Sequence, residues 1–298
     1  MGIVDLISDF FERLQLRGRL FYAGQLDGVL TLAREPGTAL LHLVEEGGVE
    51  LVQEGRPALA VNDPAILLCP DSCTYRIRSA GIRPAPVVCA SFELGKVIGL
   101  GNPLGVERTL VFAVDALPAA GPVLRLLAAE LRADHPAREK ALGVLFEYLL
   151  ILLVREALAR GMIERGVLVG MLDPQLGKAL RAIHWEPERD WEVDGLARLC
   201  GMSRSKFSAR FTELAGVPPI AYLADWRIRL AQQMMRRGTA LKIVASAVGY
   251  GSQAAFTRAF SGHCGMSPGE WLRRGASSSA VSASAAAAVS AAPSTSLH

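Results

Sequence analysis

The sequence has few aromatic residues, few histidines and no long apolar run. Aromatic residues make up 6% of the 298 residues, and five histidines are present. The longest uninterrupted apolar run is Tyr148–Val154, far short of the ~20 residues that a membrane span needs. The first twenty residues carry Asp5, Asp9 and Glu12 within an apolar stretch, which is not typical of a secretory signal. We therefore expect a cytoplasmic protein with no membrane partner.

Cysteine is also scarce, and its distribution is irregular. The five cysteines are odd in number and scattered: Cys69, Cys73, Cys89, Cys200 and Cys264. This usage does not indicate a disulfide framework and fits a reducing compartment. Hydrophobic residues make up 51% and charged residues 20%, so a wholly disordered chain is excluded. The length predicts about two domains.

The charge is small overall but unevenly distributed. The net charge is +3, yet Arg198–Arg274 holds 12 Lys and Arg against 3 Asp and Glu, a net of +9. The remainder holds 20 against 26, a net of −6. An acidic body with a basic C-terminal module indicates a polyanionic partner for that module. A solvated charged face explains the charge alone equally well.

Residues 1–118 show the pattern of a β-rich domain. Short apolar runs alternate with Gly, Pro, Asn and Asp turn residues, which favours a barrel or sandwich. The predicted strands are Val29–Ala33, Ala39–Val44, Val49–Gln53, Ala65–Cys69, Tyr75–Ile77 and Val87–Phe92.

Residues 119–170 change to a helical pattern. His135-Pro136 divides it into two predicted helices, 121–134 and 137–160. The second is apolar on nearly all sides and should be buried on two sides. It would lie either between the barrel and another helix or between two subunits, so it is our candidate for homodimerisation. Gly161–Gly170 is predicted as a linker, and 276–298, nearly all Ala and Ser, as a disordered tail.

Residues 171–275 contain a repeat with an offset of 49 residues. A Ser, two Phe, a Gly, a Pro and an aromatic residue recur at identical spacing: Ser203, Phe207, Phe211, Gly216, Pro219 and Tyr222 match Ser252, Phe256, Phe260, Gly265, Pro268 and Trp271. Each copy follows a short amphipathic segment that ends in Gly201 or Gly249. A helix, a Gly turn and a second helix capped by Ser predict a helix-turn-helix. A helical bundle in which the repeats only serve packing is the alternative.

The second helix of each unit carries the predicted DNA contacts. The two Phe lie four residues apart, share one face and should point into the core. This leaves short polar and basic side chains outward, as entry into the major groove requires. The predicted DNA-binding residues are Ser203, Arg204, Ser205, Lys206, Ser208, Ala209, Arg210, Ser252, Gln253, Ala254, Thr257 and Arg258. The connector Ile220–Gly238, as a helix of about 18 residues, would span ~27 Å, which suits two grooves that lie ~34 Å apart.

These blocks resemble the AraC/XylS family of transcription regulators over about Pro174–Arg274. The resemblance is carried by WEVDGLARLCGMSRSKFSARF, GVPPIAYLADWRIRLAQQMM and IVASAVGYGSQAAFTRAFSGHCGMSPGEW. It implies a double helix-turn-helix that places its second helices in consecutive major grooves of promoter DNA, with RNA polymerase as a further partner and activation as the usual outcome. Glu192, where a Thr or Ser cap is common, and Gly195, inside a helix, depart from the family pattern.

The N-terminal half resembles the cupin-type sensor domain of one branch of that family. LLHLVEEGGVELVQEGRPALAVNDPAILLCPDSCTYRI is similar to its barrel core. The implied architecture is α+β and multidomain: a cupin-like barrel (1–118), a helical dimerisation region (119–170), an all-α double helix-turn-helix domain (171–275) and a tail (276–298). A small-molecule effector is implied in the barrel, and we expect its pocket at His42, Tyr75 and Cys89.

Two alternatives concern the barrel. A cupin metalloenzyme needs two or three His plus a Glu at one site, but the barrel region holds only His42, with Tyr75 where a second His would fall. We therefore expect no enzyme, no catalytic residue, no metal and no cofactor.

A redox-responsive regulator would use Cys69, Cys73 and Cys89, with Arg76 or Arg78 lowering a thiol pKa. Small buried cysteines are the plainer interpretation.

Overall fold

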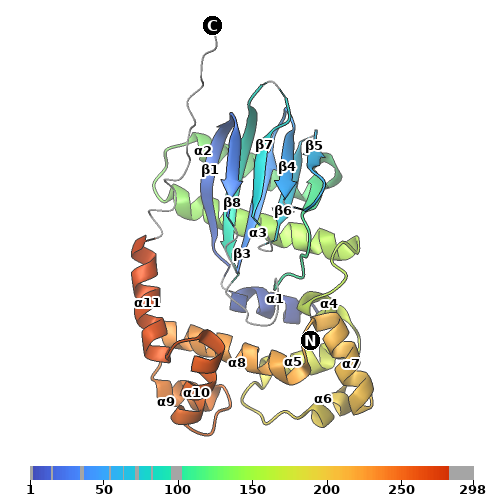
Figure 1. The fold of residues 1–298 in the computed structure, drawn as a ribbon, viewed down its shortest axis with the longest axis vertical. Coiled ribbons are helices and arrows are strands. Elements are labelled where there is room, and N and C mark those ends of the chain that lie inside the picture. Colours follow the sequence, from blue (N-terminus) through green and yellow to red (C-terminus); the bar gives the residue numbers. More distant parts are fainter. Residues whose placement is uncertain are drawn as a thin grey trace.

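The N-terminal domain is built from two antiparallel sheets that face each other (Figure 1). The computed structural model describes residues 3–14, 16–33, 37–53, 55–62, 64–70, 74–81, 83–94 and 103–281. Five strands form one sheet, in the order β1 (Gly18–Leu26), β8 (Ala85–Glu93), β3 (Thr38–Val44), β6 (Ala65–Cys69) and β9 (Leu110–Ala113). Four form the other, in the order β2 (Val29–Leu32), β7 (Tyr75–Ser79), β4 (Val49–Gln53) and β5 (Leu59–Val61). All six predicted strands are present; β1, β5 and β9 were not anticipated.

Successive side chains of a strand point to opposite faces, and on β3 both faces are covered by other parts of the chain. His42 pairs with Cys89 on β8 and with Leu67 on β6, and this row faces the four-stranded sheet inside the barrel. Leu43, the next residue, pairs with Val88 and Ile66 in a row that faces the helices. The five-stranded sheet therefore separates the barrel interior from a second apolar layer on its outer face.

The outer face of this sheet is covered by α2 (Gly121–Arg132) and α3 (Arg138–Ala159), which follow two short turns of 3-10 helix, η1 (Val114–Ala116) and η2 (Pro118–Ala120). Helix α3 lies on β1 at a pair of glycines: a Cβ on Gly18 would lie 2.8 Å from the Gly143 carbonyl oxygen, and a Cβ on Gly143 would lie 2.8 Å from that of Gly18. The predicted apolar helix is thus confirmed, with its buried sides facing the sheet and α2. Val144 and Tyr148 remain about half exposed.

Two further helices connect the barrel to the C-terminal half. Helix α1 (Ile3–Leu14), which was not anticipated, lies between the sheets and the C-terminal helices and contacts α4 (Val167–Leu172) and α8 (Pro219–Arg236) (Figure 1). The predicted linker Gly161–Gly170 is partly wrong, because α4 begins at Val167 and is largely buried. No helix in the described part of the chain is long and apolar enough to cross a membrane.

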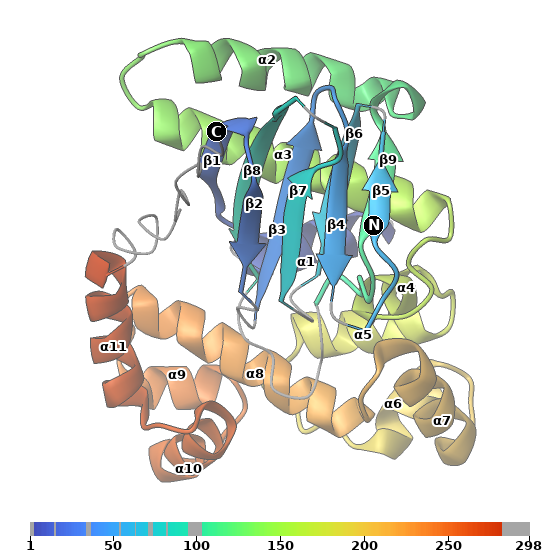
Figure 2. The same ribbon diagram turned by 45° about the horizontal axis from the view of Figure 1, so that its top comes forward.

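The C-terminal half is all helical and reproduces the predicted repeat. Its elements are α5 (Leu176–Trp185), α6 (Val193–Leu199), α7 (Arg204–Ala215), α8 (Pro219–Arg236), α9 (Leu241–Ala247), α10 (Gln253–Cys264) and α11 (Pro268–Val281). Helices α7 and α10 lie toward opposite ends of α8 (Figures 1 and 2). Helix α11 continues to Val281, so the disorder predicted from residue 276 is wrong up to that point; residues 282–298 lie outside the described part.

The two helix-turn-helix units differ in the core that supports them. Phe207 and Phe211 of the first unit belong to one apolar cluster with α1, α2, α3 and the outer face of the five-stranded sheet. Phe256 and Phe260 of the second unit belong to a separate cluster with α8, α9 and α11. The first unit is therefore continuous with the sensor domain, whereas the second has a core of its own.

Candidate nucleic-acid interface and effector site

Helix α7 presents a short polar face outward, as predicted from the first repeat. The Ser203 hydroxyl accepts a hydrogen bond from the Lys206 backbone N–H at 3.4 Å and caps the helix. Phe207 and Phe211 are fully buried, which fixes the rotation of the helix. Of the predicted contacts in this unit, Ser208 is half-buried. Five others are exposed: Ser203, Arg204, Ser205, Lys206 and Ala209.

Helix α10 repeats this arrangement and carries an exposed arginine, Arg258. The Ser252 hydroxyl accepts from the Ala255 backbone N–H at 3.1 Å, and Phe256 and Phe260 are fully buried. Ser252, Gln253, Ala254 and Arg258 are exposed, and Thr257 is half-buried. Within the described residues, no carboxylate forms an ion pair with Arg258. Its guanidinium is therefore available to an anion from outside the chain.

Two of the predicted arginines already have partners. Arg204 forms an exposed ion pair with Asp194 at 3.2 Å. Arg210 is turned toward α5, where its guanidinium pairs with Asp173 and donates to Gln175 Oε1 at 3.0 Å. Burial raises the pKa of the Asp173 carboxyl, but N–H donors of Leu176 and Gln175 and the Arg210 guanidinium outweigh it and lower the pKa. Arg210 thus joins α7 to α5, and its DNA contact stays a prediction.

The relative placement of the two units is fixed by Arg227 on α8. Its Nε donates to the Pro187 carbonyl oxygen at 2.7 Å, and its Nη2 donates to the Arg189 carbonyl oxygen at 2.9 Å. Gly249, at the turn of the second unit, packs against the same loop: a Cβ there would lie 2.8 Å from Glu188 and from Arg227. The turn of one unit therefore rests on the loop of the other.

A buried carboxylate, missed in the sequence, joins α8 to α10. Asp225 is 3% exposed. Its Oδ2 accepts from Arg229 Nε and its Oδ1 lies at hydrogen-bond distance from His263 Nε2, both at 2.9 Å. Arg229 also donates to the carbonyl oxygen of Leu94 in the sensor domain at 3.5 Å. In the sequence, Asp225 is an acidic residue on an otherwise apolar helix face, and this pattern could have identified it as a buried carboxylate.

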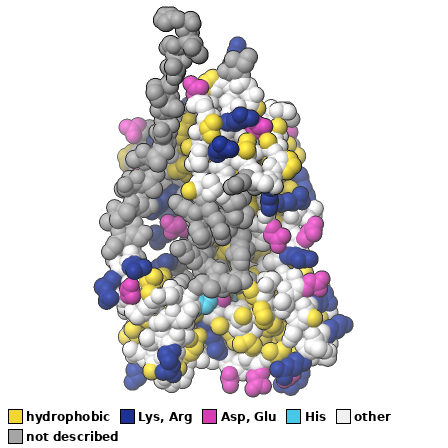
Figure 3. Space-filling view, in the orientation of Figure 1, with side chains coloured by type: hydrophobic (Ala, Val, Ile, Leu, Met, Phe, Trp, Pro, Cys, Tyr) yellow, Lys and Arg dark blue, Asp and Glu magenta, His cyan; other side chains and the backbone are white. Residues whose placement is uncertain are grey.

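Basic side chains mark both ends of the helical half. In the view of Figure 3, Lys and Arg lie over the α9–α11 side and over the α6–α7 side, with an apolar area between them. Phosphate contacts at two separated positions suit such a distribution.

Inside the barrel, the structure brings together the three residues predicted to line an effector pocket. His42 Nε2 lies 2.6 Å from the Tyr75 hydroxyl, which bridges the two sheets. Cys89 lies beside His42 on the neighbouring strand. All three are buried. Burial lowers the pKa of His42 to about 4, so its imidazole is neutral at pH 7, and its Nδ1 has no hydrogen-bond partner among the described groups.

The histidine and the two described thiols of the barrel are buried, and the nearby arginines are exposed. No group of three His, Cys, Asp or Glu that could hold a metal occurs among them. Cys69 and Cys89 are fully buried, and burial, together with Cys69, raises the pKa of the Cys89 thiol. The side chains of Arg76 and Arg78 point away from the interior, and Arg78 pairs with Glu50. Cys73 lies outside the described residues.

Comparisons with known proteins agree with this geometry. A family model described as a cupin matches residues 5–159, and one described as a helix-turn-helix domain matches residues 196–274. The HTH-type transcriptional regulator AlkR of Acinetobacter baylyi is 35% identical over 57% of this chain, but the match spans only 58% of that relative. An uncharacterized HTH-type transcriptional regulator of Haemophilus influenzae is 30% identical over 91% of this chain and 99% of its own length.

Among solved structures, ToxT of Vibrio cholerae aligns with 87% of this chain and 96% of its own, at 15% identity and a TM-score of 0.38, too low to support an argument about function. The sequence relatives have higher identity, and two of them, from Streptomyces, are named as putative AraC-like transcription regulators. The two family models together with a relative aligned over nearly its whole length confirm the resemblance: the chain belongs to the AraC/XylS family of helix-turn-helix transcription regulators, in the branch with a cupin-type N-terminal domain.

Proposed function

We propose that the protein is a sequence-specific DNA-binding transcription regulator whose cupin-like domain senses a small molecule. The observation that carries this proposal is the repeated helix-turn-helix, in which α7 and α10 bury both of their Phe and expose short polar and basic side chains. Helix α8 has 18 residues, about 27 Å of rise, so both helices can enter adjacent major grooves on one side of a duplex.

The two classes of DNA contact fall to different side chains. Lys206, Arg204 and Arg258 contact phosphates and supply affinity that falls with salt. Ser205, Ala209 and Gln253, together with the remaining predicted positions on the two helices, face base edges and supply discrimination. On this proposal residues 171–275 form the DNA-binding domain, 1–118 the sensor and 119–170 the region that connects them.

DNase footprinting tests the proposal directly. We expect the purified protein to protect one contiguous patch of roughly twenty base pairs upstream of its own or a neighbouring gene, because both helices dock side by side. Arg258→Ala should weaken binding in a gel shift about tenfold. The exposed Arg132→Ala on α2 serves as the matched control and should leave affinity unchanged. Absence of any protected patch, or equal affinity of the two variants, would contradict the proposal.

The sensor half completes the proposed mechanism. We infer that an effector binds in the barrel near His42, Tyr75 and Cys89 and shifts the population of DNA-competent arrangements. We further propose a homodimer, activation through RNA polymerase, and action in the cytoplasm, where a promoter-binding protein meets its target. A promoter–reporter assay in a deletion strain checks the sign of regulation: lower expression without the protein supports activation, and higher expression shows repression.

A further inference from the structure

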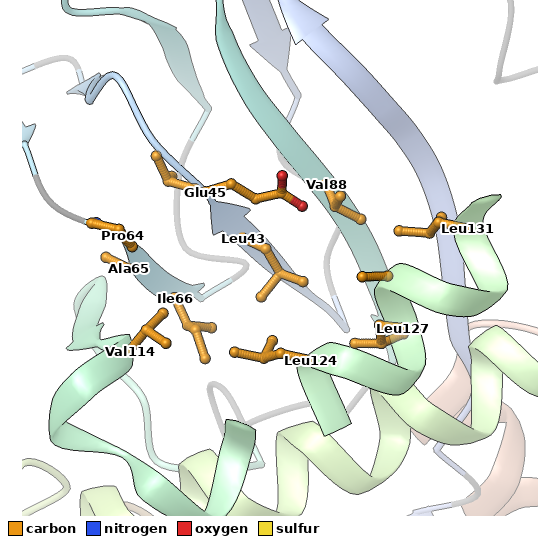
Figure 4. A pocket seen from close by; sticks show the side chains of 12 residues that line it. Leu43, Glu45, Pro64, Ala65, Ile66, Val88, Val114, Leu124, Leu127 and Leu131 are labelled. Carbon is orange, nitrogen blue, oxygen red and sulfur yellow. The ribbon is translucent and has the colours of Figure 1, made fainter. Parts of the chain in front are cut away.

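The outer face of the five-stranded sheet holds a pocket that the barrel-interior site does not explain. It lies between the sheet and α2 and measures about 210 Å³ (Figure 4). Its floor is the cross-strand row of Val88, Leu43 and Ile66. This row is one residue along the strands from the row of Cys89, His42 and Leu67, and it points in the opposite direction. The pocket and the barrel interior are therefore two separate compartments.

The wall of the pocket comes from one face of α2. Leu124, Leu127 and Leu131 recur at three- and four-residue spacing and point toward the sheet, as Figure 4 shows. Ala128 lies on the same face. Its methyl group leaves open the space that a larger side chain would fill. The pocket thus results from a small residue within a stripe of leucines.

The size and lining of the pocket define one part of its ligand. A dry cavity of about 150 Å³ lined by Leu, Ile and Phe is large enough to bind benzene. At about 210 Å³, this one accommodates a slightly larger apolar group, such as a ring with substituents or a chain of about six carbons.

The charge at the mouth of the pocket defines the other part of the ligand. Of the described residues that line the pocket, Glu45 alone carries a charge. Its side chain is exposed, forms no ion pair within the described residues, and its carboxylate lies over the pocket in Figure 4. A ligand with an apolar body inside the pocket and a cationic end at its mouth would pair with this carboxylate.

We propose that this pocket binds small lipophilic ammonium compounds and is a second ligand site, separate from the barrel interior. Its role as an effector site rests on the proposed function, whereas the binding itself does not. Helix α2 packs on α3, which shares its apolar cluster with the first helix-turn-helix unit. A ligand that wedges α2 away from the sheet would therefore act on the core beneath α7.

Methyl NMR of the full chain tests the proposal, with n-hexylamine as the probe and n-hexanol and hexanoate as uncharged and anionic comparisons. We expect hexylammonium to shift the methyl signals of Leu43, Ile66 and Leu124 but not those of Leu51 and Ile77 in the barrel interior. Hexanoate should bind at least fivefold more weakly. Shifts confined to the barrel interior, or equal affinity for the three probes, would overturn the proposal.

Two pairs of variants separate the pocket from its surroundings. Ala128→Phe fills the space and should weaken hexylammonium binding at least tenfold, whereas Ala129→Phe, on the exposed side of the same helix, should not. Glu45→Gln should weaken it about two- to fivefold, as the loss of an exposed ion pair predicts, and the neighbouring Glu46→Gln should not. Equal binding within either pair would contradict the assignment. A gel shift without probe, on the same samples, reports separately on DNA binding.

Discussion

His42 is a buried base whose protonation opposes folding. Burial lowers its pKa to about 4 from 6.5. Between these pH values the unfolded chain binds a proton that the folded chain does not, so the free energy of unfolding falls as the pH drops from 6.5 to 4. The shift corresponds to about 3 kcal/mol.

Urea titrations between pH 7 and pH 4.5 check this prediction. His42→Gln should remove most of the loss of stability across this window, because the titrating group is gone. If His42→Gln loses stability as steeply as the wild type, His42 does not titrate as predicted.

Gly249 and Gly201 occupy equivalent turns but carry different constraints. Both have a left-handed backbone, with φ of +81° and +65°. A Cβ on Gly249 would lie 2.8 Å from Glu188 and Arg227, whereas a Cβ on Gly201 meets nothing within 4 Å. Gly201→Ala should therefore cost about 1 kcal/mol of backbone strain, and Gly249→Ala should cost clearly more. Thermal unfolding of both variants measures the difference, and equal losses would show that the two units do not press on each other at Gly249.

Residue spacing predicted some of these roles but not others. Ser203 and Ser252 were identifiable as caps because each precedes a Phe pair at fixed spacing. Arg210 and Arg258 lie three and two residues after the first Phe of their units. The sequence did not show that Arg210 meets a carboxylate, because Asp173 is 37 positions away. The Asp225 contacts and the Ala128 pocket depend in the same way on partners that only the tertiary fold brings together.

At the level of elements, alternation and helical periodicity predicted most of the architecture. Strands β4 and β6 were predicted to the residue, and α2, α3 and α8 to within two residues at either end. Helix α1 was missed although Leu6, Phe10 and Leu14, all buried, lie four residues apart. Helix α4 was missed because it is short and begins after a glycine, where a linker was expected.

Helix α3 remains our candidate for the dimer interface, but only through its exposed residues. Leu149 is fully buried, so a charge there would disrupt the core instead of testing assembly. Tyr148 and Val144 are 49% and 48% exposed. Tyr148→Asp should convert a dimer to a monomer in gel filtration with its circular dichroism unchanged. Val29→Asp, at an equally exposed apolar residue of β2, is the control, and a wild-type protein that elutes as a monomer would refute the interface.

At the level of the whole molecule, the two helix-turn-helix units should open independently. Phe207 packs in the large cluster shared with the sensor, and its counterpart Phe256 packs in the separate cluster of the second unit. A smaller core exposes less apolar surface when it opens, so its opening free energy is lower. Native-state hydrogen exchange should therefore show lower opening free energies for α9 and α10 than for α6 and α7.

The matched substitutions Phe207→Leu and Phe256→Leu sharpen this prediction. Phe256→Leu should reduce protection only in α9, α10 and the adjoining part of α8. Phe207→Leu should also reduce protection in α4 and α5, because these helices share its cluster. Loss of protection across the whole chain in both variants would show a single cooperative unit.

The two helix-turn-helix units pack on different apolar clusters, and this difference affects how regulators of this kind diverge. Substitutions that adapt the sensor to a new chemical signal also change the apolar cluster beneath α7, whereas the apolar cluster beneath α10 is separate from the sensor. Over many generations, the promoter DNA bound by the first unit would therefore change whenever the inducer changes. The promoter DNA bound by the second unit would change little. Asymmetric operators, variable in one half and constant in the other, are the trace that this history would leave in related genomes.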